Sequence, residues 1–292
     1  MTLEQLRIFV AVAERAHVTQ AARALNLTQS AVSDSVAALE ARHGVRLFDR
    51  VGRTVVLNQI GQAFLAEARG VLARAEAAET LLADLALVRR GRLLIEASQT
   101  IASYWLPPYL VRFHREFPGV RLDVTIGNTA GVVRSVREGE VELGFIEGRV
   151  DDPLLADRVV GHDQLVIVVA PTHPWADGAP LAPDDLTGSP WVMREAGSGT
   201  RSTLESSLVA AKVALGELEV AMTLPSNEAV LAAVREGAGA TALSESAVAV
   251  ALATGQLCQV GFTLPIRGYR MVRHKERYFS RAADSLVKLI TG

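Results

Sequence analysis

The chain of 292 residues has little of what extracellular and membrane proteins need. Its single cysteine, Cys258, cannot form an internal disulfide, which suits a reducing cytoplasm. No run of 18 or more apolar residues is present, so the sequence predicts no transmembrane helix. The first residues, MTLEQLR, lack the charged and then apolar pattern of an export signal, and we therefore expect a cytoplasmic protein.

The usual signatures of catalysis and metal binding are also missing. The six histidines are scattered, with no pair four residues apart and no cysteine cluster beside them. Ser198 lies in Gly-Ser-Gly and not in the Gly-x-Ser-x-Gly turn of hydrolases, and no Walker loop occurs. We expect no catalytic residue, no metal and no cofactor.

A strongly basic charge, the usual sign of a nucleic-acid-binding protein, is missing from the chain as a whole, whose formal net charge is −2. The first 60 residues differ, because seven arginines and five acidic residues leave them a net charge of +2. This basic bias is weak in one chain. A dimer would double it, since phosphate contacts add across the two half-sites of a DNA operator.

The most informative segment of the chain is residues 19–40, which predict two short helices around a tight turn. Thr19 and Thr28 are each expected to cap one helix, and apolar residues recur on one face of both helices. The opposite face of the second helix carries short hydrogen-bonding side chains that suit the reading of base edges in the major groove. The candidate DNA contacts here are Thr28, Gln29, Ser30, Ser33 and Asp34. An ordinary helical hairpin is the alternative.

The residues that follow predict a small hairpin, which would complete a winged helix-turn-helix. Gly44 is expected to end the second helix, and residues 45–57 predict two short strands around a central turn. Arg50 and Arg53 would lie on this wing, where arginines bind phosphates or enter the minor groove.

One set of residues within positions 3–50 carries a family resemblance. The set consists of Leu3, Leu6 and Phe9, then Ala21, Ala22 and Leu25, then residues 28–33, Leu39 and Glu40, and finally Gly44, Val45, Leu47, Phe48 and Arg50. In these positions, residues 1–60 resemble the DNA-binding domain of a LysR-type transcriptional regulator. The resemblance implies a homodimer or dimer of dimers that binds a double-stranded DNA operator and contacts RNA polymerase.

Two positions depart from the family pattern. Asp34 stands where the family often has a basic or larger residue, so the inherited operator specificity is in doubt. Asn58 replaces the customary threonine before Gly61, and asparagine is also a good helix cap.

Residues 61–90 predict a long helix with an apolar seam. The segment has no proline, and apolar residues recur at alternating steps of four and three, which is the pattern of a coiled coil. The seam consists of Phe64, Ala68, Val71, Ala75, Ala78, Leu82 and Leu85. The family resemblance implies that this linker helix pairs antiparallel with its twin. A helix that lies along its own domain is the alternative.

Residues 91–292 predict an α/β domain with a largely parallel sheet, because short apolar runs alternate with helical segments. The expected strands are 93–97, 122–126, 142–146, 165–170 and 269–273, and the expected helices lie near 102–117, 129–139, 200–214, 227–236, 245–253 and 279–290. We expect two lobes with a hinge where the chain crosses between them. Lobe I would span about 91–163 and 267–292 and lobe II about 164–266, with crossings near 162–164 and 264–268.

Four polar clusters stand at expected helix starts, where the crevice of such a domain binds ligands. The candidate effector-binding residues are Ser98, Gln99, Thr100, Asn128, Thr129, Gly197, Ser198, Gly199, Thr200, Arg201, Ser226 and Asn227. Helix amino termini carry free N–H groups, and Arg201 would add a permanent cation, so the expected ligand is a small anion. The alternative is that these side chains only cap their helices.

The expected fold is α/β overall: an N-terminal winged helix-turn-helix, a long linker helix and a two-lobed, type 2 periplasmic-binding-protein-like effector domain. Its expected function is transcription control by a small effector. The alternatives are an enzyme built on the two-lobed domain and a solute receptor, which the lack of an export signal disfavours. Residues 197–201 and 226–229 further resemble regulators of sulfur assimilation and carbon fixation.

Overall fold

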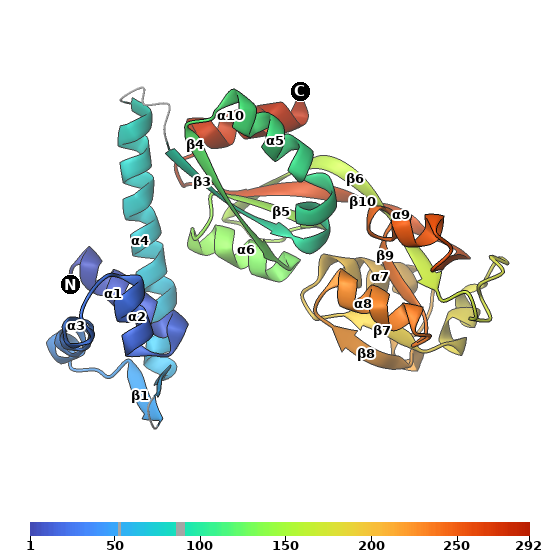
Figure 1. Ribbon diagram of the computed structural model, residues 1–292, viewed down its shortest axis with the longest axis horizontal. Coiled ribbons are helices and arrows are strands. Elements are labelled where there is room, and N and C mark those ends of the chain that lie inside the picture. The colour runs from blue at the N-terminus through green and yellow to red at the C-terminus, as the bar shows by residue number, and fades with distance from the viewer. Residues whose placement is uncertain (52–53, 86–90) are drawn as a thin grey trace. The chain divides into compact units, whose positions relative to one another are not determined.

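The computed structural model describes residues 1–51, 54–85 and 91–292, and of residues 50, 51, 80 and 83–85 it describes the backbone alone (Figure 1). Arg53 and the side chain of Arg50, both predicted to lie on the wing, are therefore outside the described part. The chain divides near residue 87 into two compact units.

The first unit is a winged helix-turn-helix followed by a long helix, as the sequence predicts. Its elements are α1 (Leu3–Arg15), α2 (Val18–Ala24), α3 (Gln29–His43), β1 (Phe48–Val51), β2 (Thr54–Leu57) and α4 (Gln59–Leu85). The strands β1 and β2 pair antiparallel, with Phe48 opposite Leu57, and form the wing.

The ends of α3 follow their local signals, whereas the start of α2 does not. The Thr28 hydroxyl accepts a hydrogen bond from the Ala31 N–H at 3.2 Å, and Gly44 ends the helix with a φ of +65°. The expected cap at Thr19 is wrong, because α2 already begins at Val18. The extended backbone that a cap requires belongs to His17, whose side chain makes no capping hydrogen bond.

The wing is fastened to the helices by an aromatic cluster and by one carboxylate. The ring of Phe9 in α1 lies 5.4 Å from the ring of Phe48 in β1 and 4.9 Å from that of Phe64 in α4, measured between centroids. Glu40 in α3 accepts hydrogen bonds from the N–H groups of Leu47 and Phe48, at 2.7 and 3.3 Å. The orientation of the wing relative to α3 therefore depends on Glu40.

The helix α4 packs along its own domain at its start and leaves part of its apolar seam exposed. Asn58 caps it, since its side-chain oxygen accepts from the Gly61 N–H at 2.9 Å. Ala68 is buried against α1, so the first turns lie along their own domain. Further along the seam, Val71 is 42% exposed and Leu82 68% exposed, which leaves an apolar stripe uncovered within this unit.

The second unit is built on a six-stranded sheet in the order β4-β3-β5-β10-β6-β9. The strands are β3 (Gly91–Ser98), β4 (Val120–Gly127), β5 (Leu143–Glu147), β6 (Leu155–Val169), β9 (Thr241–Ser244) and β10 (Cys258–His274), and a separate parallel pair is formed by β7 (Trp191–Arg194) and β8 (Val220–Leu224). The predicted parallel pairing holds for β3, which pairs parallel with both β4 and β5, while β10 runs antiparallel to β5 and β6.

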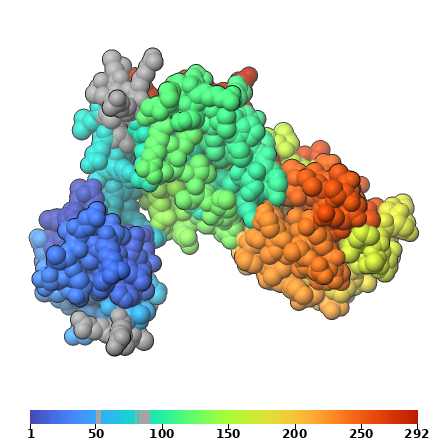
Figure 2. Space-filling view, viewed as in Figure 1, coloured from blue at the N-terminus to red at the C-terminus, as the bar shows by residue number. Residues whose placement is uncertain are grey.

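Helices cover the sheet in two lobes. They are α5 (Pro107–Glu116), α6 (Thr129–Glu138), α7 (Gly199–Ala210), α8 (Asn227–Arg235), α9 (Glu245–Ala253) and α10 (Arg281–Thr291), with short turns at Ile101–Trp105, Pro183–Gly188 and Leu215–Glu217. In the first lobe, α5 and α10 lie on one face of the sheet and α6 on the other (Figure 1). In the second lobe, α7 packs on one face, while α8 and α9 pack on the other. The two lobes touch along one edge in the space-filling view (Figure 2).

The passage between the lobes differs from the expectation of short strands joined by crossing segments. The strands β6 and β10 are 15 and 17 residues long and run from one lobe into the other. Their pairing continues through the polar residues of the crossing, where Asp163 lies opposite Arg267. A prediction of strands from apolar runs ends a strand at such residues. The backbone hydrogen bonds between β6 and β10 nevertheless continue past them. Among the described residues, no helix is long and apolar enough to span a membrane.

A substitution at Glu40 tests how the wing is held. We expect Glu40→Ala to weaken the attachment of the wing by about 1–3 kcal/mol, because two backbone N–H groups lose their acceptor. Hydrogen exchange of the full chain, followed by mass spectrometry over residues 44–57, should then be faster than in the unmodified protein. The matched control Glu40→Gln keeps one acceptor oxygen and should lie in between. Unchanged exchange at Leu47 and Phe48 in Glu40→Ala would contradict this role.

Candidate functional site

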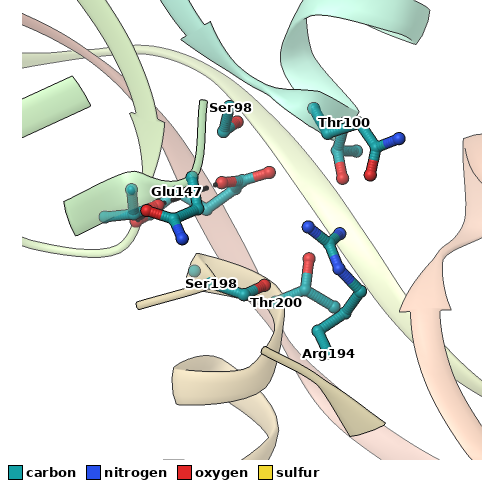
Figure 3. Close-up of a pocket in the computed structure, with 10 residues that line it drawn as sticks. Ser98, Thr100, Glu147, Arg194, Ser198 and Thr200 are labelled. Carbon is teal, nitrogen blue, oxygen red and sulfur yellow. Dashed lines mark hydrogen bonds between the residues drawn. The ribbon is translucent and has the colours of Figure 1, made fainter. Parts of the chain in front are cut away.

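A polar pocket lies between the two lobes of the second unit. It encloses about 160 Å³ of space, part of it open to solvent, and it is lined by Ser98, Gln99, Thr100, Asn128, Thr129, Glu147, Arg194, Ser198, Gly199 and Thr200. Ser98 ends β3 in the first lobe and Thr100 follows it, and both face Arg194, Ser198 and Thr200 of the second lobe (Figure 3). Eight of the lining residues are among the twelve that the sequence predicts.

Two helices begin at this pocket. Asn128 caps α6, with its side-chain oxygen accepting from the Gly131 N–H at 2.9 Å, and Ser198 caps α7 by accepting from the Arg201 N–H at 3.4 Å. These side chains are therefore caps and lining residues at once. The partial positive charge of a helix amino terminus favours negative charge nearby, so both helices make the pocket more attractive to an anion.

Gly199 lets the start of α7 approach the first lobe. A Cβ atom at this position would come within 2.5 Å of the Thr129 hydroxyl and 2.9 Å of a Glu147 carboxylate oxygen. Real Cβ atoms do not approach other heavy atoms so closely. Any larger residue would therefore displace the Thr129 and Glu147 side chains or the helix start itself.

The two threonines at the pocket each already accept a hydrogen bond. The Thr100 hydroxyl accepts from the side-chain amide of Asn227 at 3.2 Å, and the Thr200 hydroxyl accepts from Arg267 at 3.1 Å. A hydroxyl has one proton to donate besides its acceptor positions. Because Asn227 and Arg267 donate to the two hydroxyl oxygens, each hydroxyl proton points away from these donors and is available to a bound molecule.

Ser98 is the one lining residue whose buried hydroxyl has no hydrogen-bond partner among the described residues. Its side chain is deeply buried, with 3% of the residue exposed. A buried polar group without a partner costs about 1–3 kcal/mol. A ligand that pairs with this hydroxyl would recover that free energy.

Three charged residues at the pocket were not predicted from the sequence. Glu147 and Arg194 line it, and Arg267 lies behind it with its guanidinium 2.6 Å from Asp163 and 3.8 Å from Glu147. All three are at most 5% exposed. The signal that could have found two of them is local, because Glu147 and Arg194 each end a buried apolar strand.

The structure places four predicted residues outside the lining of the pocket. Arg201 was expected to supply its cation, but its guanidinium donates to Glu205 at 2.7 Å and to the Arg194 carbonyl at 3.2 Å, so the lining arginine is Arg194. The Gly197 carbonyl accepts from the Ala130 N–H at 3.1 Å.

The other two residues stand at the start of α8. The Ser226 hydroxyl caps this helix by accepting from the Ala229 N–H at 3.1 Å, which matches the capping alternative. Asn227 is fully buried behind Thr100.

The candidate DNA contacts of α3 lie together on its surface. Thr28, Gln29, Ser30 and Asp34 are exposed, and Ser33 is half-buried. The Gln29 amide lies 3.5 Å from the Ser33 hydroxyl, as expected for side chains four residues apart on one helix face. The apolar residues Val32 and Leu39 point into the core of the same unit.

Outside the pocket, the polar groups of the second unit include side chains of the types that bind metals, in the described part of the chain. The described residues contain no group of three or more side chains that could hold a metal ion. Burial lowers the pKa of His173, and both of its ring nitrogens are used, one with Ser189 at 2.8 Å and one with the Trp175 N–H at 3.1 Å. This histidine is a structural residue of its turn.

Comparison with known proteins covers nearly the whole chain. Residues 3–62 match the bacterial regulatory helix-turn-helix proteins of the lysR family, and residues 87–292 match the LysR substrate binding domain. The chain is 35% identical over 284 residues to the HTH-type transcriptional regulator YeiE of Escherichia coli (strain K12), covering 97% of this chain and 94% of that protein. It is 30% identical over 287 residues to a probable RuBisCO transcriptional regulator of Cyanophora paradoxa, covering 97% and 89%.

Solved structures agree on the fold. CbnR, a LysR family transcriptional regulator, superimposes with a TM-score of 0.72 at 22% identity, covering 99% of this chain and 98% of that one. Full-length OxyR from Pseudomonas aeruginosa gives a TM-score of 0.70 at 24% identity, covering 99% and 94%. The RuBisCO regulator among the relatives agrees with the predicted resemblance to regulators of carbon fixation, whereas the resemblance to sulfur regulators stays a prediction.

These relatives are transcriptional regulators, which sets aside the enzyme and solute-receptor alternatives. By its winged helix-turn-helix, its two-lobed substrate-binding domain and these matches along its length, the chain belongs to the LysR family of DNA-binding transcriptional regulators.

Proposed function

We propose that a small anionic effector binds the pocket between the two lobes and thereby controls how residues 1–60 act on DNA. The observation that carries the proposal is the set of free donors at the pocket. The protons of Thr100 and Thr200 are available, the buried hydroxyl of Ser98 is unpaired, and two helix amino termini begin there. A pocket rich in donors selects a molecule rich in acceptors.

The charges around the pocket are compatible with an anion. Glu147 is the one acidic lining residue, and its carboxylate accepts from the Thr129 hydroxyl at 3.3 Å and lies 3.8 Å from the Arg267 guanidinium. Arg194 is a buried cation of the lining and pairs with Glu195 at 2.9 Å, while Arg267 behind the pocket pairs with Asp163 at 2.6 Å. Since both arginines already have carboxylate partners, the repulsion between Glu147 and an anion is opposed mainly by the helix termini and the hydroxyl donors.

Structural neighbours support a small-molecule ligand for this kind of domain. The regulatory domain of CcmR from Synechocystis PCC6803 has been solved in complex with 2-PG, and the effector-binding domain of QuiR in complex with shikimate. Their TM-scores against this chain are 0.63 and 0.62, at 21% and 16% identity. At these identities the likeness concerns the fold.

The same proposal assigns a separate role to each of three segments of the chain. Residues 1–60 would bind an operator, residues 61–90 would pair with a second chain, and residues 91–292 would bind the effector. The exposed Val71, Leu81 and Leu82 of α4 favour a homodimer or a dimer of dimers, since such a pairing would cover them. Structures of the family include full-length CbnR complexed with its target DNA. Contact with RNA polymerase follows from the family resemblance alone.

A screen of anions tests the proposed function. Sodium sulfate, phosphate, nitrate and acetate, compared with sodium chloride at equal ionic strength, should include at least one salt that raises the melting temperature of the full chain more than that of Thr100→Val, which corrects for the general stabilisation of folded proteins by sulfate and phosphate. The reason is that a ligand that binds only the folded state stabilises it. The same salt should change the affinity for upstream DNA in a gel shift. No stabilisation by any member of a wider anion panel would contradict the proposal.

The two threonines give the sharpest variants. Thr100→Val and Thr200→Val keep the shape of the side chain but remove its donor, so each should weaken the binding of a stabilising anion by about 1–3 kcal/mol. Thr100→Ser and Thr200→Ser keep the hydroxyl and are the matched controls. Isothermal titration of the full chain measures the loss. Full-strength binding by both valine variants would rule out this pocket, whereas DNA binding without ligand should persist in all four proteins.

A separate prediction concerns the reading of DNA by α3. Gln29→Ala should weaken binding to the specific operator by about 1–3 kcal/mol while leaving binding to random DNA nearly unchanged, because base-edge contacts carry the specificity. Ser33→Ala tests the neighbouring position, and Arg42→Ala, at the far end of the same helix, is the control. Fluorescence anisotropy with both DNAs measures the difference. Equal losses on both DNAs would show that Gln29 only positions the helix.

A further inference from the structure

Asn227 is a neutral side chain that is fully buried between the lobes and bonded on every side. Its backbone N–H donates to the Gln99 side-chain oxygen at 2.8 Å. Its side-chain oxygen accepts from the Arg194 guanidinium, and its side-chain NH₂ donates to the Thr100 hydroxyl at 3.2 Å. Asn227 thus joins a pocket residue of the second lobe to two of the first.

The chemistry of arginine fixes the direction of this chain of hydrogen bonds. A guanidinium can only donate, so the group that meets Arg194 must be the oxygen of the Asn227 amide. The NH₂ group is then the one that faces Thr100, and the threonine oxygen must accept. The only proton of the Thr100 hydroxyl is left for the pocket.

We propose that Asn227 is a positioning residue, which holds the Thr100 hydroxyl as a donor and so makes this side of the pocket specific for acceptor groups. The inference rests on the proposed function, because it concerns the same pocket. It assigns to Asn227 an effect on the ligand without contact to it, since Asn227 is absent from the lining.

The equivalent threonine of the other lobe is held in a similar way by a charged residue. Thr200 accepts from Arg267, whose guanidinium also pairs with Asp163. A substitution of Arg267 would therefore leave a buried carboxylate unpaired and disturb the crossing strands. Asn227 is neutral and belongs to no ion pair, so its substitution leaves no carboxylate unpaired. Its effect on the threonine can therefore be tested more directly.

The opposing view is that Asn227 only ties the two lobes together. Both views are separated by Asn227→Asp and Asn227→Leu. Aspartate keeps the size and still accepts from Arg194, but its second oxygen would accept the Thr100 proton and turn it away from the pocket. Leucine removes every side-chain hydrogen bond but leaves the Thr100 hydroxyl free to rotate toward a ligand. A tie between the lobes predicts the greater loss for leucine, whereas control of the proton predicts it for aspartate.

The added negative charge of aspartate would by itself repel an anion, so the test is made with and without the hydroxyl. Sulfate and inorganic phosphate are titrated calorimetrically into the full chain, into Asn227→Asp, Asn227→Leu and Thr100→Val, and into the double variant with Thr100→Val and Asn227→Asp. We expect Asn227→Asp to weaken binding about tenfold or more, and to change it less than about threefold when Thr100 is already valine.

Each outcome of this experiment decides the matter. If Asn227→Asp lowers anion affinity by the same factor with and without the Thr100 hydroxyl, the effect is only that of the added negative charge. A greater loss of affinity for Asn227→Leu than for Asn227→Asp would show that Asn227 only ties the lobes together. Binding at full strength by Asn227→Asp would also overturn the inference while leaving the proposed pocket intact. Failure of both anions to bind the unmodified chain would contradict this inference for inorganic oxyanions, whereas the proposed anion site is contradicted only when the wider anion panel also fails. Circular dichroism checks that every variant is folded. If Asn227→Asp is not folded, Asn227→Leu still separates the two roles: a tie between the lobes predicts a large loss of anion affinity, and control of the Thr100 proton predicts a small one.

Discussion

The second unit depends on the buried pair of Arg267 and Asp163, which lie opposite each other where β10 and β6 pass between the lobes. A buried cation needs a partner of opposite charge, and here the partner belongs to the neighbouring strand. The same guanidinium donates to the Thr200 hydroxyl, while Asp163 accepts from Ser244 at 2.6 Å. The crossing of the two strands, the second lobe and the pocket are therefore held by one polar cluster.

The cluster extends to the first lobe through neighbouring side chains. Burial, together with the negative charge of Asp163, raises the pKa of Tyr269, so this phenol stays neutral in the core of the first lobe. Glu147, at the end of β5, lies within 3.8 Å of Arg267 and also lines the pocket. A molecule bound beside Glu147 and Thr200 would thus act directly on groups that hold the crossing together. This is a physical route by which occupancy of the pocket could alter how the lobes are held.

Local signals in the sequence were enough for much of the fold. Thr28 and Gly44 mark the ends of α3 through a cap and a left-handed residue, and both act within a few residues of the chain. The helix starts at Asn128 and Ser198 were predicted for the same reason, and these polar starts also gave most of the pocket. Thr19 failed as a cap because capping depends on where the backbone leaves the extended conformation, which the residue type alone does not determine.

The parts that sequence reasoning missed are those that depend on distant partners. The strands β7 and β8 pair with each other in parallel, with one further bridge from Trp191 to Ala240, and neither has an apolar run long enough to stand out. Arg201 lies in the first turn of α7 and Arg194 at the end of β7, and their roles differ because Glu205 lies one turn after the first and Asn227 lies beside the second. The sequence predicts only one part each of β6 and β10, residues 165–170 and 269–273, since polar residues at a crossing look like a loop until their partners are known.

We propose that the pocket between the lobes receives an anion through the hydroxyl groups of both lobes. A crystal structure of the chain grown with its most stabilising anion is the decisive measurement. We expect the anion at the starts of α6 and α7, within hydrogen-bond distance of the Thr100 and Thr200 hydroxyls and with Ser98 paired. An anion bound at another surface, with Thr100, Thr200 and Ser98 free of it, would overturn the proposed site.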